Sequence, residues 1–189
     1  MDLRDLQRQF EQMASAEVQR QFYMGCTKEV ASRFLRKVTF KTQPSKTLEV
    51  EEATGEFYKR GKNKGKVKTK KVVKRLGGTL RRGWTAKTYE EALSGNTPDV
   101  PTYVNTRLEM QHNNSNYVAV ITNPVPYASF VESGHRQEKG RFVPVLGKRL
   151  KKTWVDGQFW LADSEAETRA EIPSVLQRRL DKFLKNGGN

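Results

Sequence analysis

The chain has 189 residues, a length that suits one hydrophobic core with appendages. Only 35% of the residues are hydrophobic, which predicts that part of the chain lies outside any core or is covered by partners. Lys and Arg number 35 against 21 Asp and Glu, so the charge of +14 favours nucleic acid, an acidic membrane surface or an acidic protein as partner. A single cysteine, Cys26, excludes an intrachain disulfide, and with only His112 and His135 the chain lacks a ligand set for structural zinc.

The N-terminal region, residues 1–40, has a helical pattern. Apolar residues recur every three or four positions between Asp2 and Lys37, which predicts one long amphipathic helix or two abutting ones. Ser15 is a candidate N-cap where the helix could break, and Gly25 is its weakest interior point. The charged first residues and the lack of a long apolar window predict a cytosolic protein without signal peptide or membrane span.

Residues 42–75 are predicted to form an extended basic arm. Short β-prone pieces precede a lysine-rich run with Gly61 and Gly65 in its turn-like middle, which indicates a β-hairpin with a mobile tip. The run suits a solvated or protein-binding arm, and non-specific contact with DNA is the alternative, because interleaved aromatic residues and a recognition helix are missing. Its ten basic residues are Lys59, Arg60, Lys62, Lys64, Lys66, Lys68, Lys70, Lys71, Lys74 and Arg75.

The middle of the chain combines a short helix with a hairpin. Leu76–Trp84 is expected to form one or two helical turns, with Thr79 as N-cap and with Leu80 and Trp84 facing the core. Thr102–Asn123 predicts a β-hairpin, because turn-forming residues separate two β-rich runs. Both faces of the second strand are apolar, so we expect helices or another subunit to cover both.

A short helix and a loop are expected next. Tyr127–Gly134 has the pattern of a two-turn helix that a glycine C-cap closes. Residues 135–154 are predicted to be a loop, with the apolar island FVPVLG between basic flanks.

The last helix is expected from Asp156 or Ser164 to Leu184, with a kink or restart at Pro173. Its apolar stripe consists of Ile172, Val175, Leu176, Leu180, Phe183 and Leu184. Carboxylates gather at its start, where they form either a solvated face or a docking site for a basic neighbour: Asp163, Glu165, Glu167 and Glu171.

The segment TNPVPYASFVESGHR, Thr122–Arg136, resembles an element of the tail-completion family of tailed bacteriophages and phage-tail-like particles, also called neck or head–tail joining proteins. The matching residues are Asn123, Val125, Tyr127, Ala128, Val131, Glu132 and Gly134. Upstream, LRRGW at Leu80–Trp84 matches a second element in the same order. The resemblance covers Leu76–Arg136 best and hardly touches the lysine run or residues 142–161.

The resemblance implies an α+β fold in which a long N-terminal helix and a C-terminal helix pack on a small antiparallel sheet, here with the basic hairpin arm added. It also implies a homo-oligomeric ring, commonly of about six subunits, at the neck or collar of a tail assembled in the bacterial host cytoplasm. The implied partners are tail-tube, tail-terminator, sheath or head-connector proteins. One domain is expected over 1–189, with a family-like core at 76–136 and the loop and last helix at 137–189.

The segment after the hairpin supplies the candidate contact residues for a neighbouring subunit or partner: Tyr127, Phe130, Glu132, His135 and Arg136. The alternative is that Tyr127, Phe130 and Val131 are plain core residues. A buried Glu132 would need hydrogen-bond donors in either case.

Catalytic motifs are missing from the sequence, which has neither a G-x-S-x-G element nor a P-loop. Cys26 lies within the first helical pattern and is expected to be a small buried apolar residue. We therefore expect a non-catalytic structural protein without cofactor or metal, and non-specific DNA binding through the lysine-rich arm is the alternative function.

Overall fold

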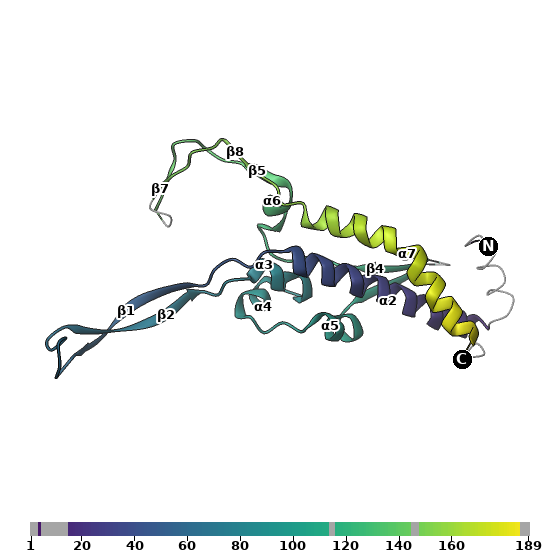
Figure 1. Ribbon diagram of the computed structural model, residues 1–189, viewed down its shortest axis with the longest axis horizontal. Helices are drawn as coiled ribbons and strands as arrows, with labels where there is room; N and C mark the ends of the chain where they lie inside the picture. Colours follow the sequence, from purple (N-terminus) through teal and green to yellow (C-terminus); the bar gives the residue numbers. More distant parts are fainter. Residues whose placement is uncertain (1–3, 5–14, 114–115, 145–147, 186–189) are drawn as a thin grey trace.

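The computed structural model describes residues 4, 15–113, 116–144 and 148–185. Two long helices, α2 (Ala16–Lys41) and α7 (Trp160–Lys185), lie side by side and form the body of an elongated molecule (Figure 1). Two β-ribbons project from one end of this body. The elements between the helices are β1 (Leu48–Phe57), β2 (Val67–Arg75), α3 (Thr79–Arg82), the 3-10 turn η1 (Gly83–Thr85), α4 (Tyr89–Ser94), α5 (Val100–Thr106), β3 (Glu109–Asn113), β4 (Asn116–Val120), α6 (Ala128–Ser133), β5 (Gly134–Arg136), β6 (Phe142–Val143), β7 (Lys148–Arg149) and β8 (Trp154–Asp156). This mixture of helices and antiparallel strands confirms the predicted α+β class.

Helix α2 begins where the sequence predicts a cap. The Ser15 hydroxyl accepts a hydrogen bond from the Val18 amide at 3.4 Å. The helix predicted before this residue lies outside the described residues, except for Arg4. Gly25 does not interrupt α2, and a Cβ placed on it would lie 2.4 Å from Nη2 of Arg179 on α7. The glycine therefore leaves room for the Arg179 guanidinium against α2.

The core joins α2 to the short helices. Leu35 and Val38 of α2 pack against Trp84, and the indole Nε1 of Trp84 donates to the buried Thr42 hydroxyl at 2.9 Å. Leu80 and Trp84 face the interior, as predicted. The residue before α3 is Gly78, and the predicted cap Thr79 is already the first helical residue, with its hydroxyl donating to the Leu76 carbonyl at 3.2 Å.

The predicted hairpin is shorter than Thr102–Asn123. Strands β3 and β4 pair over Glu109–Val120, but the expected start of the first strand forms helix α5. The Asp99 carboxylate caps this helix by accepting the Thr102 amide at 3.0 Å. Tyr103 then lies buried against the core, so tertiary packing outweighs the β-propensity of the segment.

The two faces of strand β4 differ in cover within the described part of the chain, although Val120 is half-buried like the residues over α2. Tyr117 and Ala119 are half-buried over α2, whereas Val118 on the opposite face is 48% exposed. Cover of that face by another subunit stays a prediction.

Residues 135–154 are not the predicted loop. Strand β5 pairs with β8 and β6 pairs with β7, both antiparallel, and together they build the second ribbon. Each strand has only two or three residues, too few to show a β-pattern in the sequence, and the partners in the β5–β8 pair lie about twenty positions apart.

Helix α7 runs through Pro173 and bends part-way along its length (Figure 1), as the proline predicts. Most of the predicted stripe is at least partly buried, but Leu184 is 44% exposed and does not belong to it. Within the described residues no helix is long and apolar enough to cross a membrane.

Ion pairs join α7 to α2. Lys41 Nζ lies 2.6 Å from a Glu167 oxygen, and Lys37 Nζ lies 2.7 Å from a Glu171 oxygen. These two carboxylates thus pair with a helix of the same chain, while their side chains stay 52% and 42% exposed on the predicted solvated face. Docking of a basic neighbour there stays a prediction. Arg179 of α7 and Glu29 of α2 make a further contact at 2.9 Å.

Acidification is expected to weaken this helix pair. The hydrogen bond from Lys37 lowers the pKa of Glu171, and at Glu29 hydrogen bonds from Arg179 and Arg33 lower the pKa although burial opposes them. The stabilisation is therefore present above the ordinary carboxyl pKa of about 4.3 and is lost as the pH falls through the lower folded value. Thermal denaturation by circular dichroism should show a falling Tm below about pH 4.5, with a smaller fall for Glu171→Gln. The same fall in both proteins would contradict this account.

Candidate assembly interface

The two sequence elements that resemble the tail-completion family pack directly against each other. Asn123 Nδ2 donates to the Leu80 carbonyl at 3.0 Å, and Asn123 Oδ1 accepts the Val125 amide at 3.2 Å. A Cβ placed on Gly83 would lie only 2.1 Å from Asn123 Oδ1. Asn123 and Gly83 therefore join segments about forty positions apart, a role that the sequence motif did not disclose.

Helix α6 presents aromatic side chains to the surface. It ends at Gly134, whose φ of 79° fits the predicted glycine C-cap. Phe130 is 56% exposed and Tyr127 is also exposed, whereas Val131 is half-buried. The alternative that Tyr127 and Phe130 are plain core residues is therefore wrong for the single subunit.

Glu132 joins α6 to α7 within the chain. Both of its carboxylate oxygens accept the Leu161 amide at 3.0 Å, and Oε1 also accepts the Ala162 amide at 3.1 Å. A carboxylate at this position accepts hydrogen bonds from the free amides at the start of α7, and its negative charge interacts favourably with the dipole of that helix. Glu132 thus has the donors that it was predicted to need, and they come from its own subunit.

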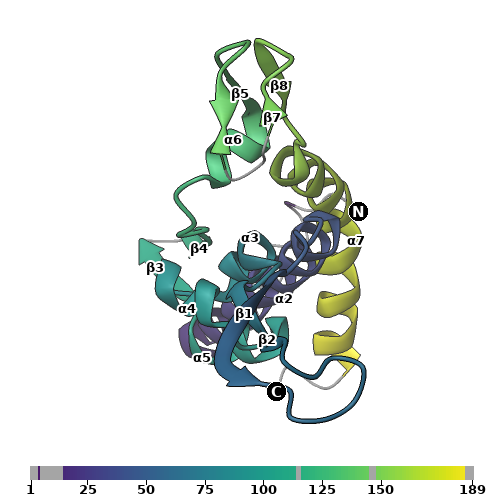
Figure 2. The ribbon, with the colours of Figure 1, turned by 90° about the vertical axis from the view of Figure 1, so that its left-hand side faces the viewer.

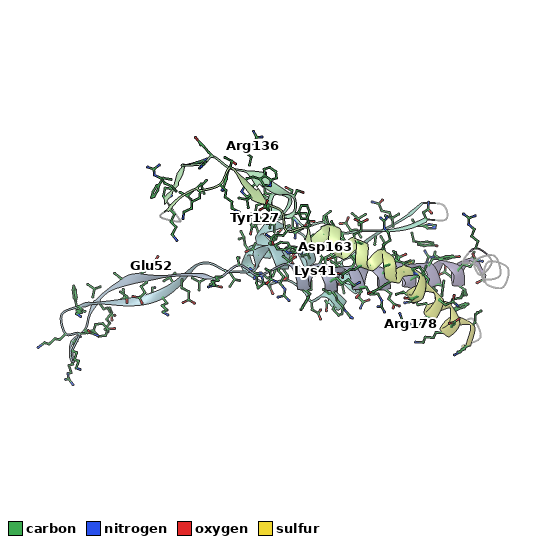
Figure 3. The ribbon with its side chains drawn as sticks, turned by 45° about the horizontal axis from the view of Figure 1, so that its top comes forward. Lys41, Glu52, Tyr127, Arg136, Asp163 and Arg178 are labelled. Carbon is green, nitrogen blue, oxygen red and sulfur yellow. The ribbon has the colours of Figure 1, made fainter. Side chains whose placement is uncertain are left out.

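His135 and Arg136 lie on the first strand of the second ribbon. His135 pairs with Val155 across the ribbon, and its ring meets the Phe130 ring edge-on at a centroid distance of 6.0 Å. Its Nδ1 atom is buried without a hydrogen-bond partner among the residues that the structure describes. Arg136 stands opposite Trp154 and is exposed, while Tyr127 lies at the root of the ribbon (Figure 3). The structure therefore gathers the predicted contact residues around this root, and their contact with a neighbour stays a prediction.

The basic arm is the predicted β-hairpin, but much of its charge is balanced internally. The register sets Glu52 opposite Lys70. Lys68 Nζ lies 2.9 Å from a Glu56 oxygen, and this hydrogen bond lowers the pKa of Glu56. The lysine run by itself does not reveal this balance of charges, because the acidic residues belong to the preceding strand, β1.

The tip of the arm, residues 58–66, carries the charge that remains. Tyr58 and Lys66 close it through an amide-to-carbonyl bond of 3.0 Å, and Gly61 and Gly65 both adopt a φ of 83°. No acidic residue occurs in this tip. Its five cations are Lys59, Arg60, Lys62, Lys64 and Lys66.

A known protein family matches the part of the chain that contains both sequence elements. The family described as "Bacteriophage HK97-gp10, putative tail-component" matches residues 4–134, more than two thirds of the chain, and the match includes both motif elements. The chain belongs to this family. Membership in the HK97-gp10-like family confirms the predicted relationship to phage tail proteins. The match ends at Gly134, so most of the second ribbon and all of α7 lie beyond it.

Comparisons with curated proteins and with solved structures found no match. Among the described residues, no group of three His, Cys, Asp or Glu side chains is arranged to hold a metal ion. Cys26 is buried as predicted, and burial raises the pKa of its thiol.

Proposed function

We propose that this protein is a non-catalytic structural subunit that forms a ring at the head-proximal end of a phage tail or phage-tail-like particle. There it would complete the tail and join it to the head, or cap it. The observation that carries the proposal is the large amount of aromatic surface left open at one end of the molecule. Four aromatic side chains there are between 48% and 56% exposed: Phe130, Phe142, Trp154 and Phe159. Exposed aromatic residues in this density are typical of surfaces that bind other proteins.

Family membership supports the same assignment. A tail component of this family works within the virion and beside other tail proteins, so tail-tube, tail-terminator, sheath or head-connector proteins are the proposed neighbours. A ring of about six copies would use one repeated contact between unlike surfaces of adjacent subunits.

The ring is tested by mass photometry and negative-stain electron microscopy of the purified protein, alone and mixed with the tail-tube protein. We expect closed rings of one defined mass. A protein that stays monomeric under all these conditions contradicts the proposal.

Non-specific DNA binding is the second candidate, and the five uncompensated cations at the tip of the arm favour it. Each phosphate contact releases counterions, so a filter-binding assay should show log affinity falling with log salt with a slope of about −4 to −5. Lys62→Glu combined with Lys64→Glu should weaken this binding strongly. Absence of binding by the unaltered protein at low salt rejects the candidate.

A further inference from the structure

A cationic groove runs along α2 between α5 and α7. Figure 2 shows α2 between these two helices, and α2 contacts both of them. The groove has a volume of about 720 Å³. Among its described lining residues only Glu29 and Glu171 are acidic. Five lining residues are cations: Lys28, Arg33, Arg36, Lys37 and Arg179.

Both carboxylates are already paired with cations of the groove. Glu29 oxygens lie 3.0 Å from an Arg33 nitrogen and 2.9 Å from an Arg179 nitrogen. Glu171 oxygens lie 2.7 Å from Lys37 Nζ and 3.5 Å from an Arg33 nitrogen. These ion pairs hold three cations in place, but two carboxylates cannot neutralise five cations.

Lys28 and Arg36 carry the charge that remains. Neither side chain has an ion pair or a side-chain hydrogen bond among the residues that the structure describes. Arg36 is exposed and Lys28 is half-buried. A further carboxylate of α7, Glu167, lies 2.6 Å from Lys41 and reaches Lys37 only at 3.9 Å. The groove therefore needs negative charge from outside the subunit.

The polar side chains of the groove match phosphate groups. Ser32 stands four positions from both Lys28 and Arg36, so all three lie on one face of α2, and Asn105 of α5 adds an amide. Hydrogen bonds to nucleic acid phosphates commonly come from Arg, Lys, Ser and Asn side chains. The described lining contains no aromatic residue, whereas protein contacts are rich in aromatic residues and poor in lysine. A second copy is also a poor occupant, because every copy carries a net charge of +14.

We propose that this groove binds the phosphate backbone of a nucleic acid without reading its sequence. Lys28 and Arg36 contact phosphate oxygens, and the ion-paired cations Arg33, Lys37 and Arg179 strengthen the positive potential around them. The site lies on the body of the molecule, from which the β1–β2 arm projects away (Figure 1). It is therefore separate from the arm tip, and it does not depend on the proposed ring.

Charge reversal tests the groove in a protein whose arm tip already carries Lys62→Glu and Lys64→Glu. Lys28→Glu with Arg36→Glu is added to this protein. Fluorescence anisotropy with a labelled DNA duplex at low salt should then show an affinity at least about tenfold weaker. The slope of log affinity against log salt should become shallower by about 2, because two phosphate contacts are lost.

A matched control reverses two charges outside the groove. Lys139→Glu with Lys151→Glu on the second ribbon, in the same arm-tip variant, should weaken DNA binding by less than about threefold, because no phosphate contact is lost. Unaltered thermal melting of both proteins would show that the fold is retained. Equal losses of affinity in the groove variant and the control overturn the proposal, since net charge alone then explains the binding.

Lysine acetylation read by mass spectrometry tests the site without any substitution. DNA added to the unaltered protein should protect Lys28, while Lys139 stays as reactive as before. Unchanged reactivity of Lys28 overturns the groove and leaves DNA binding by the arm tip intact. Polyglutamate that protects Lys28 as well as DNA does would make an acidic protein the ligand and overturn the phosphate assignment. An unaltered protein that binds no DNA at low salt rejects both sites.

Discussion

Replacing Trp84 by alanine is expected to lower the free energy of unfolding by about 3–5 kcal/mol. The indole is only 7% exposed and fills the space between α2 and α5, where it contacts the cluster of Leu35, Val38 and Tyr103. Its Nε1 also binds the buried Thr42 hydroxyl, so the substitution removes a buried hydrogen bond together with the apolar contacts. Urea denaturation followed by circular dichroism measures the loss.

The matched control is Trp154→Ala, which removes the same side chain from an exposed position. Its effect on the unfolding of the single subunit should stay within about 0.5 kcal/mol. Similar losses in the two variants would mean that Trp84 is not the centre of the core.

Gly83→Ala is the second substitution with a large expected effect, a loss of about 2–4 kcal/mol in unfolding free energy. The φ of Gly83 is −54°, so alanine would suit the backbone and would by itself favour a helical conformation. The added Cβ would, however, lie 2.1 Å from Asn123 Oδ1 and 2.8 Å from Val125 Cγ2. Asn123 would have to leave its place and give up its hydrogen bonds to Leu80 and Val125.

A double-mutant cycle with Asn123→Ala isolates this contact. Once the amide is removed, Gly83→Ala should cost clearly less than it does in the unaltered chain, because part of the crowding is gone. Equal losses in both backgrounds, or a stabilised Gly83→Ala protein, would contradict the proposed contact.

Several predictions of individual elements succeeded because their causes are local. The Ser15 cap needs only the amide three positions later. The Gly134 cap follows from a positive φ that glycine favours, although a Cβ there would also lie 2.5 Å from the Val155 carbonyl oxygen. The two strands of the arm pair with each other and are joined by a turn within one continuous stretch of chain. The apolar residues of α7 recur at helical spacing. For the candidate contact residues, sequence reasoning found Tyr127, Phe130 and Arg136 as a surface group, but it missed Trp154, which lay in an expected loop.

The sequence by itself determined the long helices, the basic hairpin and the family elements, since each depends on residues a few positions apart. Only the tertiary structure decided that the segment around Tyr103 is helical, because burial of that side chain against α2 outweighs its local β-propensity. The second ribbon likewise depends on pairing between Gly134 and Asp156. Glu171 forms an ion pair with Lys37, which lies 134 positions earlier in the chain. Such partners meet only after the chain has folded, so periodicity and capping rules carry no information about them.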